Sequence, residues 1–185
     1  GALTSRVGVA AYDYSSYNDE LKGSLENFYM PYWEAVATWY ESVGVGVVAG
    51  EVYNKVMDII GGPEFGVKLN PGHNIGTDEW TNSPFYKGSE IRIPDGSHFQ
   101  CDMIASSSNP VKSAICEDSV VIAGKELRGK VKSEYPDVWA RIEKRQKLMR
   151  EELGISISDD VLPLSNINAV YWPFMLDTGK ILAFR

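Results

Sequence analysis

The chain has 185 residues, of which 44% are hydrophobic and 11% aromatic, a composition typical of a globular domain and of neither a disordered nor a fibrous protein. Its 18 Lys and Arg residues stand against 25 Asp and Glu residues, and the resulting net charge of −7 argues against nucleic acid as a partner, because phosphate neutralisation requires a basic face. The longest uncharged apolar stretch, residues 43–49, is far shorter than the roughly 20 residues that span a bilayer, so we expect no membrane segment and no membrane partner.

The cysteine content and the start of the chain bear on compartment and domain organisation. Two cysteines, Cys101 and Cys116, are too few for a disulfide scaffold, and no signal peptide is recognisable, so we expect a cytoplasmic protein. The alternative is that these two cysteines form one structural disulfide. The chain begins with Gly-Ala-Leu rather than Met and enters an apolar segment within a few residues. We therefore expect one domain, residues 1–185, that lacks its N-terminal part.

The first third of the chain is predicted to hold one strand and two helices. Residues 6–14 alternate loosely between apolar and polar side chains, which favours a strand. Over residues 31–43 the apolar positions recur with a period of 3.6, which predicts a helix that ends before two glycines. The same period over residues 50–60 predicts a second helix, which ends at a Gly-Gly-Pro sequence.

The rest of the chain is predicted to form a sheet followed by a third helix. Short runs of strand-forming residues are separated by Pro, Gly, Asn and Ser clusters, as in antiparallel strands with irregular connections. These runs are residues 65–69, 89–93, 98–105 and 114–123. Pro136 begins a third helical zone, which ends at Gly154. This order predicts an α+β domain with helices packed on one face of a curved, mostly antiparallel sheet.

Polar residues on two of these predicted strands are candidates for chemistry. His98, Gln100 and Asp102 alternate along one strand and must share a face. Glu117 lies among apolar residues on the next strand, and a buried carboxylate requires a cation, a hydrogen-bond donor or water. Facing each other, Asp102 and Glu117 would form a carboxylate pair of the kind used in metal binding or acid–base catalysis. The alternative is a solvated outer face of the sheet.

The other of the two histidines, His73, lies in the sequence Asn-Pro-Gly-His-Asn-Ile-Gly. Its flanking glycines allow a close approach of the backbone to a neighbouring segment. A histidine in such a turn is either structural or part of a site, and the sequence leaves both interpretations open.

Several segments resemble, in order and approximate spacing, the pita-bread metallopeptidase family of methionine aminopeptidase, prolidase, aminopeptidase P and the metal-free hydrolase creatinase. The segments are residues 72–76 (GHNIG), 83–84 (SP), 96–102 (GSHFQCD), 115–118 (ICED), 145–154 (RQKLMREELG) and 161–165 (VLPLS). They extend over essentially the whole chain and match the aminopeptidase P and prolidase branch best. The resemblance implies a pita-bread fold and hydrolysis of an amide-type bond such as Xaa-Pro.

The resemblance also implies a set of metal ligands. The family's dinuclear site uses two aspartates about eleven residues apart, a histidine after a glycine and two glutamates on adjacent strands. His73 matches the histidine and Glu117 matches the last glutamate. Asp102 stands where the first glutamate is expected, with a side chain shorter by one methylene.

The aspartate pair of the family is not matched. Its second member falls at Asp19 or Glu20. Eleven residues earlier the chain has Gly8 or Val9, neither of which can coordinate a metal. Because two neighbouring divalent cations need several anionic oxygens to offset their repulsion, we expect no dinuclear centre.

Four residues are candidates for substrate binding. Trp80 occupies the place of a second histidine that contacts the substrate in the family's peptidases, and its indole offers one donor and no acceptor. Glu79 is suited to a substrate amine, although capping or solvation of a loop is the alternative. His98 and Gln100, on the face of Asp102, complete the set.

These observations predict a pocket with His73, Asp102 and Glu117 as catalytic residues of an aminopeptidase P-like or prolidase-like hydrolase of a peptide or small amide-type substrate. The expected cofactor is either none or one Mn, Co or Zn ion, held in a weak site by these residues and Glu20. Without metal, His73 would transfer protons in a creatinase-like route while the carboxylates attract a cationic group. The alternative is a catalytically inactive peptide- or protein-binding module on the same fold. We expect a homodimer.

Overall fold

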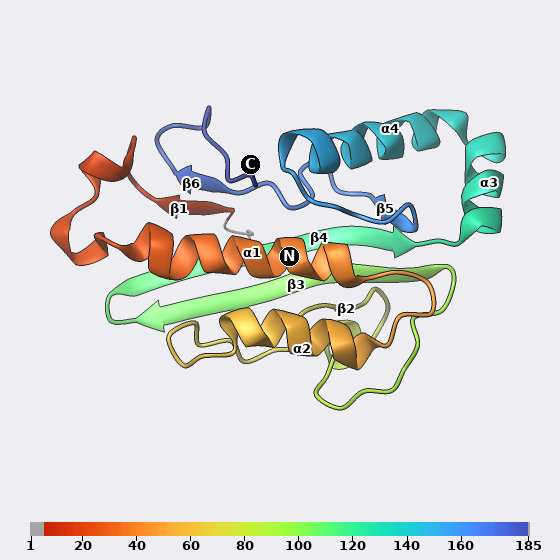
Figure 1. The fold of residues 1–185 in the computed structure, drawn as a ribbon, viewed down its shortest axis with the longest axis horizontal. Coiled ribbons are helices and arrows are strands. Elements are labelled where there is room, and N and C mark those ends of the chain that lie inside the picture. Colours follow the sequence, from red (N-terminus) through yellow and green to blue (C-terminus); the bar gives the residue numbers. More distant parts are fainter. Residues whose placement is uncertain (1–5, 185) are drawn as a thin grey trace.

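The computed structural model describes residues 6–184. Its central element is a long β-hairpin. Strands β3 (Ser97–Ser108) and β4 (Val111–Ile122) pair antiparallel along their whole length. Strand β2 (His73–Asn74) adds to β3 and strand β5 (Val161–Pro163) adds to β4, so that the strand order is β2-β3-β4-β5 (Figure 1). All three pairings are antiparallel, as predicted, although only β3 and β4 coincide with predicted strands. The opening residues, on which the expectation of a missing N-terminal part rests, lie outside the described range.

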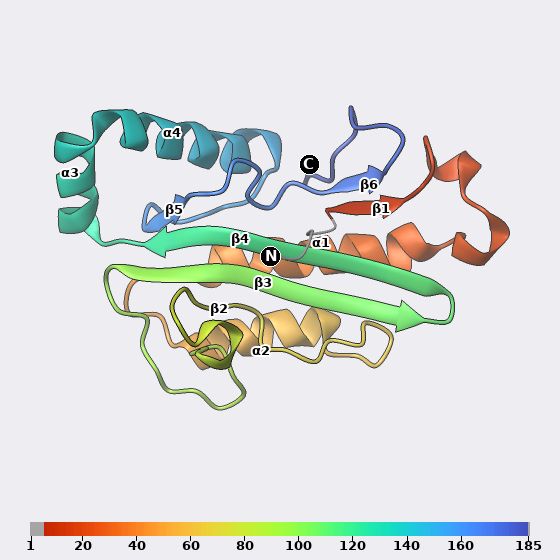
Figure 2. The ribbon, with the colours of Figure 1, turned by 180° about the vertical axis from the view of Figure 1, so that it is seen from behind.

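Two helices cover one face of this sheet. Helices α1 (Met30–Ser42) and α2 (Ala49–Ile60) begin and end within one residue of their predicted bounds and lie against β3 and β4 (Figure 1). The strand residues that face them are buried: Phe99, Cys101, Met103, Ala105, Ala114, Cys116, Val120 and Ile122. Seen from behind, the hairpin lies in front of both helices, and no element of the described chain crosses the middle of its second face (Figure 2). Sheet and helices together confirm an α+β structure.

A second helical region follows β4. Helix α3 (Lys125–Glu134) leads into α4 (Pro136–Lys147), which continues as a π-helical turn, η5 (Leu148–Glu152). The proline at the start of α4 was predicted, whereas α3 was not, because only Leu127 and Val131 form its apolar side and none of its residues is fully buried. Across residues 6–184, no helix has the length and apolar character that crossing a membrane requires.

The two ends of the described chain meet in a small sheet of their own. Strand β1 (Val7–Val9) pairs in parallel with β6 (Trp172–Phe174), so the predicted strand over residues 6–14 forms only in its first part. The remaining elements are short helical turns: η1 (Tyr14–Ser16), η2 (Asp19–Leu21), η3 (Leu25–Tyr29) and η4 (Glu79–Thr81). The first three lead into α1, and η4 follows β2.

Two predicted strands are wrong. Residues 65–69 form a loop in which a glycine with a φ of +55° turns the chain, and only Phe65 accepts a hydrogen bond from β3. Residues 89–93 pair with the loop between α1 and α2 through a single bridge, Val48 to Arg92. A short apolar run does not indicate which segment it will pair with. In both cases here, the pairing is too short to form a regular strand.

Candidate functional site

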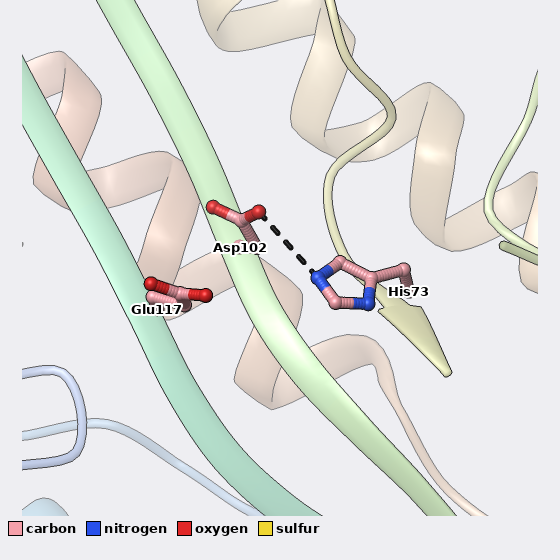
Figure 3. Close-up of side chains that lie close together, drawn as sticks. All are labelled: His73, Asp102 and Glu117. Atoms are coloured by element: carbon pink, nitrogen blue, oxygen red, sulfur yellow. Dashed lines mark ion pairs between the residues drawn. The ribbon is translucent and has the colours of Figure 1, made fainter. Parts of the chain in front are cut away.

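Three side chains from three neighbouring strands converge on the sheet face opposite α1 and α2 (Figure 3). His73 lies on β2, Asp102 on β3 and Glu117 on β4, and one ligand atom of each lies within 4.8 Å of the others. The register places Asp102 directly opposite Glu117 and His73 opposite Gln100. The structure therefore confirms that the two carboxylates face each other, and it adds the histidine from a segment about thirty residues away.

The imidazole of His73 is held in one orientation. Its Nδ1 lies 2.9 Å from the backbone oxygen of Asn74, and because a carbonyl only accepts, Nδ1 carries the proton. The other ring nitrogen, Nε2, lies 3.5 Å from Oδ2 of Asp102. In a neutral ring, Nε2 offers a lone pair to a carboxylate oxygen, so a proton or a cation is needed between them.

The site is largely shielded from water. His73 is 6% exposed and the side chain of Asp102 is 12% exposed. Burial and the nearby charge of Glu117 raise the pKa of Asp102 to about 6, while His73 acts in the opposite direction. The cluster therefore favours a bound proton or another positive charge close to neutral pH.

The polar residues beside Asp102 on β3 make two further contacts on this face. Gln100 donates from Nε2 to Oε1 of Glu117 over 2.9 Å, which fixes the orientation of that carboxylate. His98 lies with Nε2 at 2.9 Å from Oγ of Ser119, and burial lowers the pKa of His98. Both residues share the face of Asp102, as the alternation predicted, and Gln100 supports a site residue directly.

A tight turn presses β2 against β3. Gly72 has a φ of +111°, and a Cβ at this position would lie 2.7 Å from the backbone oxygen of Gln100. The hydroxyl of Ser83 donates to the backbone oxygen of Gly72 over 2.6 Å. The glycine before the histidine is thus required for the close approach that brings His73 to the carboxylates.

The other predicted site residues lie on exposed turns. Glu79 and Trp80 belong to η4, next to β2, and Trp80 is 55% exposed. Glu20 belongs to η2 and is exposed, and it is not a member of the group of ligand atoms around His73. Within the described chain, that group contains no further His, Cys, Asp or Glu residue.

A buried ion pair on the opposite face was not foreseen. Asp118 is fully buried between the sheet and the helices, where it pairs with the guanidinium of Arg6 and accepts a hydrogen bond of 2.7 Å from the backbone N–H of Ala169. The alternation that places half-buried Glu117 on the outer face of β4 directs Asp118 inward, and a carboxylate buried there requires a cation nearby. The partner lies 112 residues away and was not predictable.

Comparisons with known proteins give partial similarity only. No protein-family model matches the sequence, and no curated protein matches it. Among solved structures, dipeptidase PepE from Mycobacterium ulcerans is 23% identical with a TM-score of 0.44, covering 51% of this chain and 26% of that one. A dipeptidase from Pyrococcus horikoshii OT3 is 18% identical with a TM-score of 0.45, covering 54% and 28%. Methionine aminopeptidase from Rickettsia prowazekii is 15% identical with a TM-score of 0.43, covering 54% and 49%.

This chain spans less than half the length of each of these three peptidases. Since every TM-score lies below 0.5, the similarities define neither the complete fold nor the activity of this protein. The function of this chain must therefore be inferred from the chemistry of His73, Asp102 and Glu117.

Proposed function

We propose that this protein is a peptidase-like hydrolase with a reacting centre formed by His73, Asp102 and Glu117, and that the centre holds at most one divalent cation. The observation that carries the proposal is the convergence of an imidazole nitrogen and two carboxylates on the sheet face opposite α1 and α2. A peptide or small amide-type substrate, with Xaa-Pro as the first to test, follows from the resemblance to aminopeptidase P and prolidase.

The donor set fits a single Mn, Co or Zn ion. One imidazole and two carboxylates are ligands that these ions accept. A cation would reduce the electrostatic repulsion between the carboxylates of Asp102 and Glu117. It would also reduce the repulsion between the Nε2 lone pair of His73 and the carboxylate of Asp102. When bound, such an ion supplies Lewis-acid polarisation and activation of water. Two hydrogen bonds orient these ligands: one from His73 to the backbone oxygen of Asn74, and one from Gln100 to the carboxylate of Glu117.

A metal-free route is the second candidate, favoured by the 3.5 Å approach of His73 to Asp102. With a pKa of about 6, Asp102 can share a proton with Nε2 near neutral pH. His73 would then transfer protons to and from the substrate, while Glu117 attracts a cationic substrate group.

The decisive experiment combines elemental analysis with an activity assay. The protein is loaded with Mn, Co or Zn, the bound metal is counted, and hydrolysis of Xaa-Pro dipeptides is measured with and without a chelator. We expect about one ion per chain and turnover that both the chelator and His73→Ala abolish. Glu126→Gln is the control, because it removes an exposed carboxylate that pairs with Lys130 on α3.

Each outcome selects a different account of the site. Two bound ions with turnover would contradict the single-ion proposal. Turnover that resists the chelator but is lost in His73→Ala would support the metal-free route. Peptide binding without turnover would identify a catalytically inactive binding module. The homodimer and the cytoplasmic location stay predictions, and sedimentation analysis tests the former.

A further inference from the structure

A cavity lies on α4, away from the candidate site. It has a volume of about 390 Å³ and is lined by Arg141, Lys144, Arg145, Leu148 and Asn166. This volume is within the range of small-molecule pockets. None of its lining residues belongs to β2, β3 or β4, which carry His73, Asp102 and Glu117.

The three cations of this cavity have no acidic partner. Arg141, Lys144 and Arg145 are three and four residues apart and therefore lie on one side of α4. The neighbouring cations Lys147 and Arg150 each pair with a carboxylate, whereas within the described chain these three form no ion pair. Burial and the charge of Arg141 lower the pKa of Arg145, in agreement with an uncompensated positive cluster.

Arg145 is held in place by its surroundings. Its Nη2 donates to Oδ1 of Asn166 over 2.7 Å, and its Nη1 donates to the backbone oxygen of Pro163 over 3.4 Å. These bonds use two of the five N–H donors of a guanidinium and leave three for another acceptor. A side chain that is already fixed loses less conformational entropy when a ligand binds.

The cavity also lies in the positive part of an acidic protein. Residues 125–150 contain nine of the 18 Lys and Arg residues and only four of the 25 Asp and Glu residues. This segment therefore has a formal charge of +5 in a chain of net charge −7. Such segregation concentrates anions at α3 and α4 rather than elsewhere on the molecule.

We propose that this cavity binds a small organic anion through its carboxylate or phosphate group. Guanidinium groups bind both kinds of oxyanion with paired hydrogen bonds, and Arg141 and Lys144 add charge at the rim. Leu148 provides an apolar surface for the body of the ligand. The site is separate from the proposed hydrolytic centre, so either proposal can fail without the other.

The test is a titration of the full chain followed by backbone amide NMR, with inorganic phosphate, phenyl phosphate and benzoate as probes. We expect saturable shifts confined to α4, η5 and Asn166, and tighter binding of phenyl phosphate than of inorganic phosphate because the ring contacts Leu148. Comparison of phenyl phosphate with benzoate distinguishes a phosphate from a carboxylate ligand. Arg141→Gln is expected to weaken binding about tenfold.

Lys125→Gln is the matched control, since it removes the same charge from α3 at a residue that does not line the cavity. It should change the affinity less than twofold, and Lys144→Gln should reproduce the loss seen in Arg141→Gln. Equal losses in Lys125→Gln and Arg141→Gln would overturn the proposal, because they would indicate a diffuse basic field. Shifts that fail to saturate, or that spread evenly over α3 and α4, would overturn it as well. The amide spectra of the free variants verify that they remain folded.

Discussion

Gln100 and Glu117 are joined across the hairpin by a hydrogen bond of 2.9 Å between the amide Nε2 and the carboxylate Oε1. The bond connects β3 to β4 beside the directly opposed pair of Asp102 and Glu117. It leaves the carboxylate of Glu117 with a defined orientation toward the cluster. Second-layer contacts of this kind commonly change metal affinity by ten- to a hundredfold.

Gln100→Ala should therefore weaken the binding of a divalent cation. We expect a loss of about tenfold in affinity for Mn or Zn, because the freed carboxylate must be ordered when the ion binds. Calorimetric titration of the chelator-treated protein provides the measurement. Ser108→Ala, at the far end of the same strand, is the control and should bind as the unmodified chain does. An unchanged affinity in Gln100→Ala would show that this contact does not orient a ligand.

Asp102→Asn should stabilise the metal-free protein near neutral pH. The pKa of Asp102 is raised from 3.8 to about 6 in the folded state. Above pH 6 the carboxylate is charged in both states, and the folded state bears the unfavourable free energy of burying it. As the pH falls from 6 toward 3.8, the folded state takes up a proton before the unfolded chain does, and this unfavourable contribution disappears.

The gain in unfolding free energy from Asp102→Asn is thus expected to be about 3 kcal/mol at pH 7.5 and less than about 1 kcal/mol at pH 4. Urea denaturation of both proteins at several pH values, in the presence of a chelator, measures it. A variant less stable than the parent at pH 7.5 would contradict the proposed effect of burial.

Arg6→Met should destabilise the fold strongly. It leaves the carboxylate of Asp118 buried without its cation, and breaking such a pair costs about 3 kcal/mol of unfolding free energy. The double variant Arg6→Met/Asp118→Asn should recover most of that loss, since no charge then remains buried. Lys130→Met, which breaks an exposed pair with Glu126, should change stability by less than about 0.5 kcal/mol. Urea denaturation measures the unfolding free energy of each variant. A double variant no more stable than Arg6→Met would show that the loss does not come from the unpaired charge of Asp118.

Gly72→Ala should disturb the position of His73. The added methyl group would meet the backbone oxygen of Gln100 at 2.7 Å, and a φ of +111° is unfavourable for alanine. We expect a loss of about 2 kcal/mol in unfolding free energy together with weaker metal binding. Gly76→Ala is the matched control, because a Cβ there meets no atom within 4 Å. Equal effects of both substitutions would refute the role of the close approach.

Periodicity was a reliable guide wherever one side of an element is apolar. It predicted α1 and α2 to within a residue and placed His98, Gln100 and Asp102 on one face of β3. It failed for α3, whose apolar side consists of only two partly buried residues. It also failed for residues 65–69 and 89–93, whose short apolar runs are typical of buried loops as well as of strands. Assigning Glu20 by counting along the chain also failed to bring it into the cluster.

The sequence by itself determined the α+β class and the polar face of β3, because side-chain alternation and apolar spacing are local properties. The three residues of the candidate site were predicted from the resemblance to the metallopeptidase family. Tertiary structure alone decided that Asp102 lies opposite Glu117, that His73 closes the cluster and that Arg6 neutralises Asp118. These relationships join residues 15 to 112 positions apart. Strand register and long-range pairing depend on how the whole chain packs, so they leave no signal in any single segment.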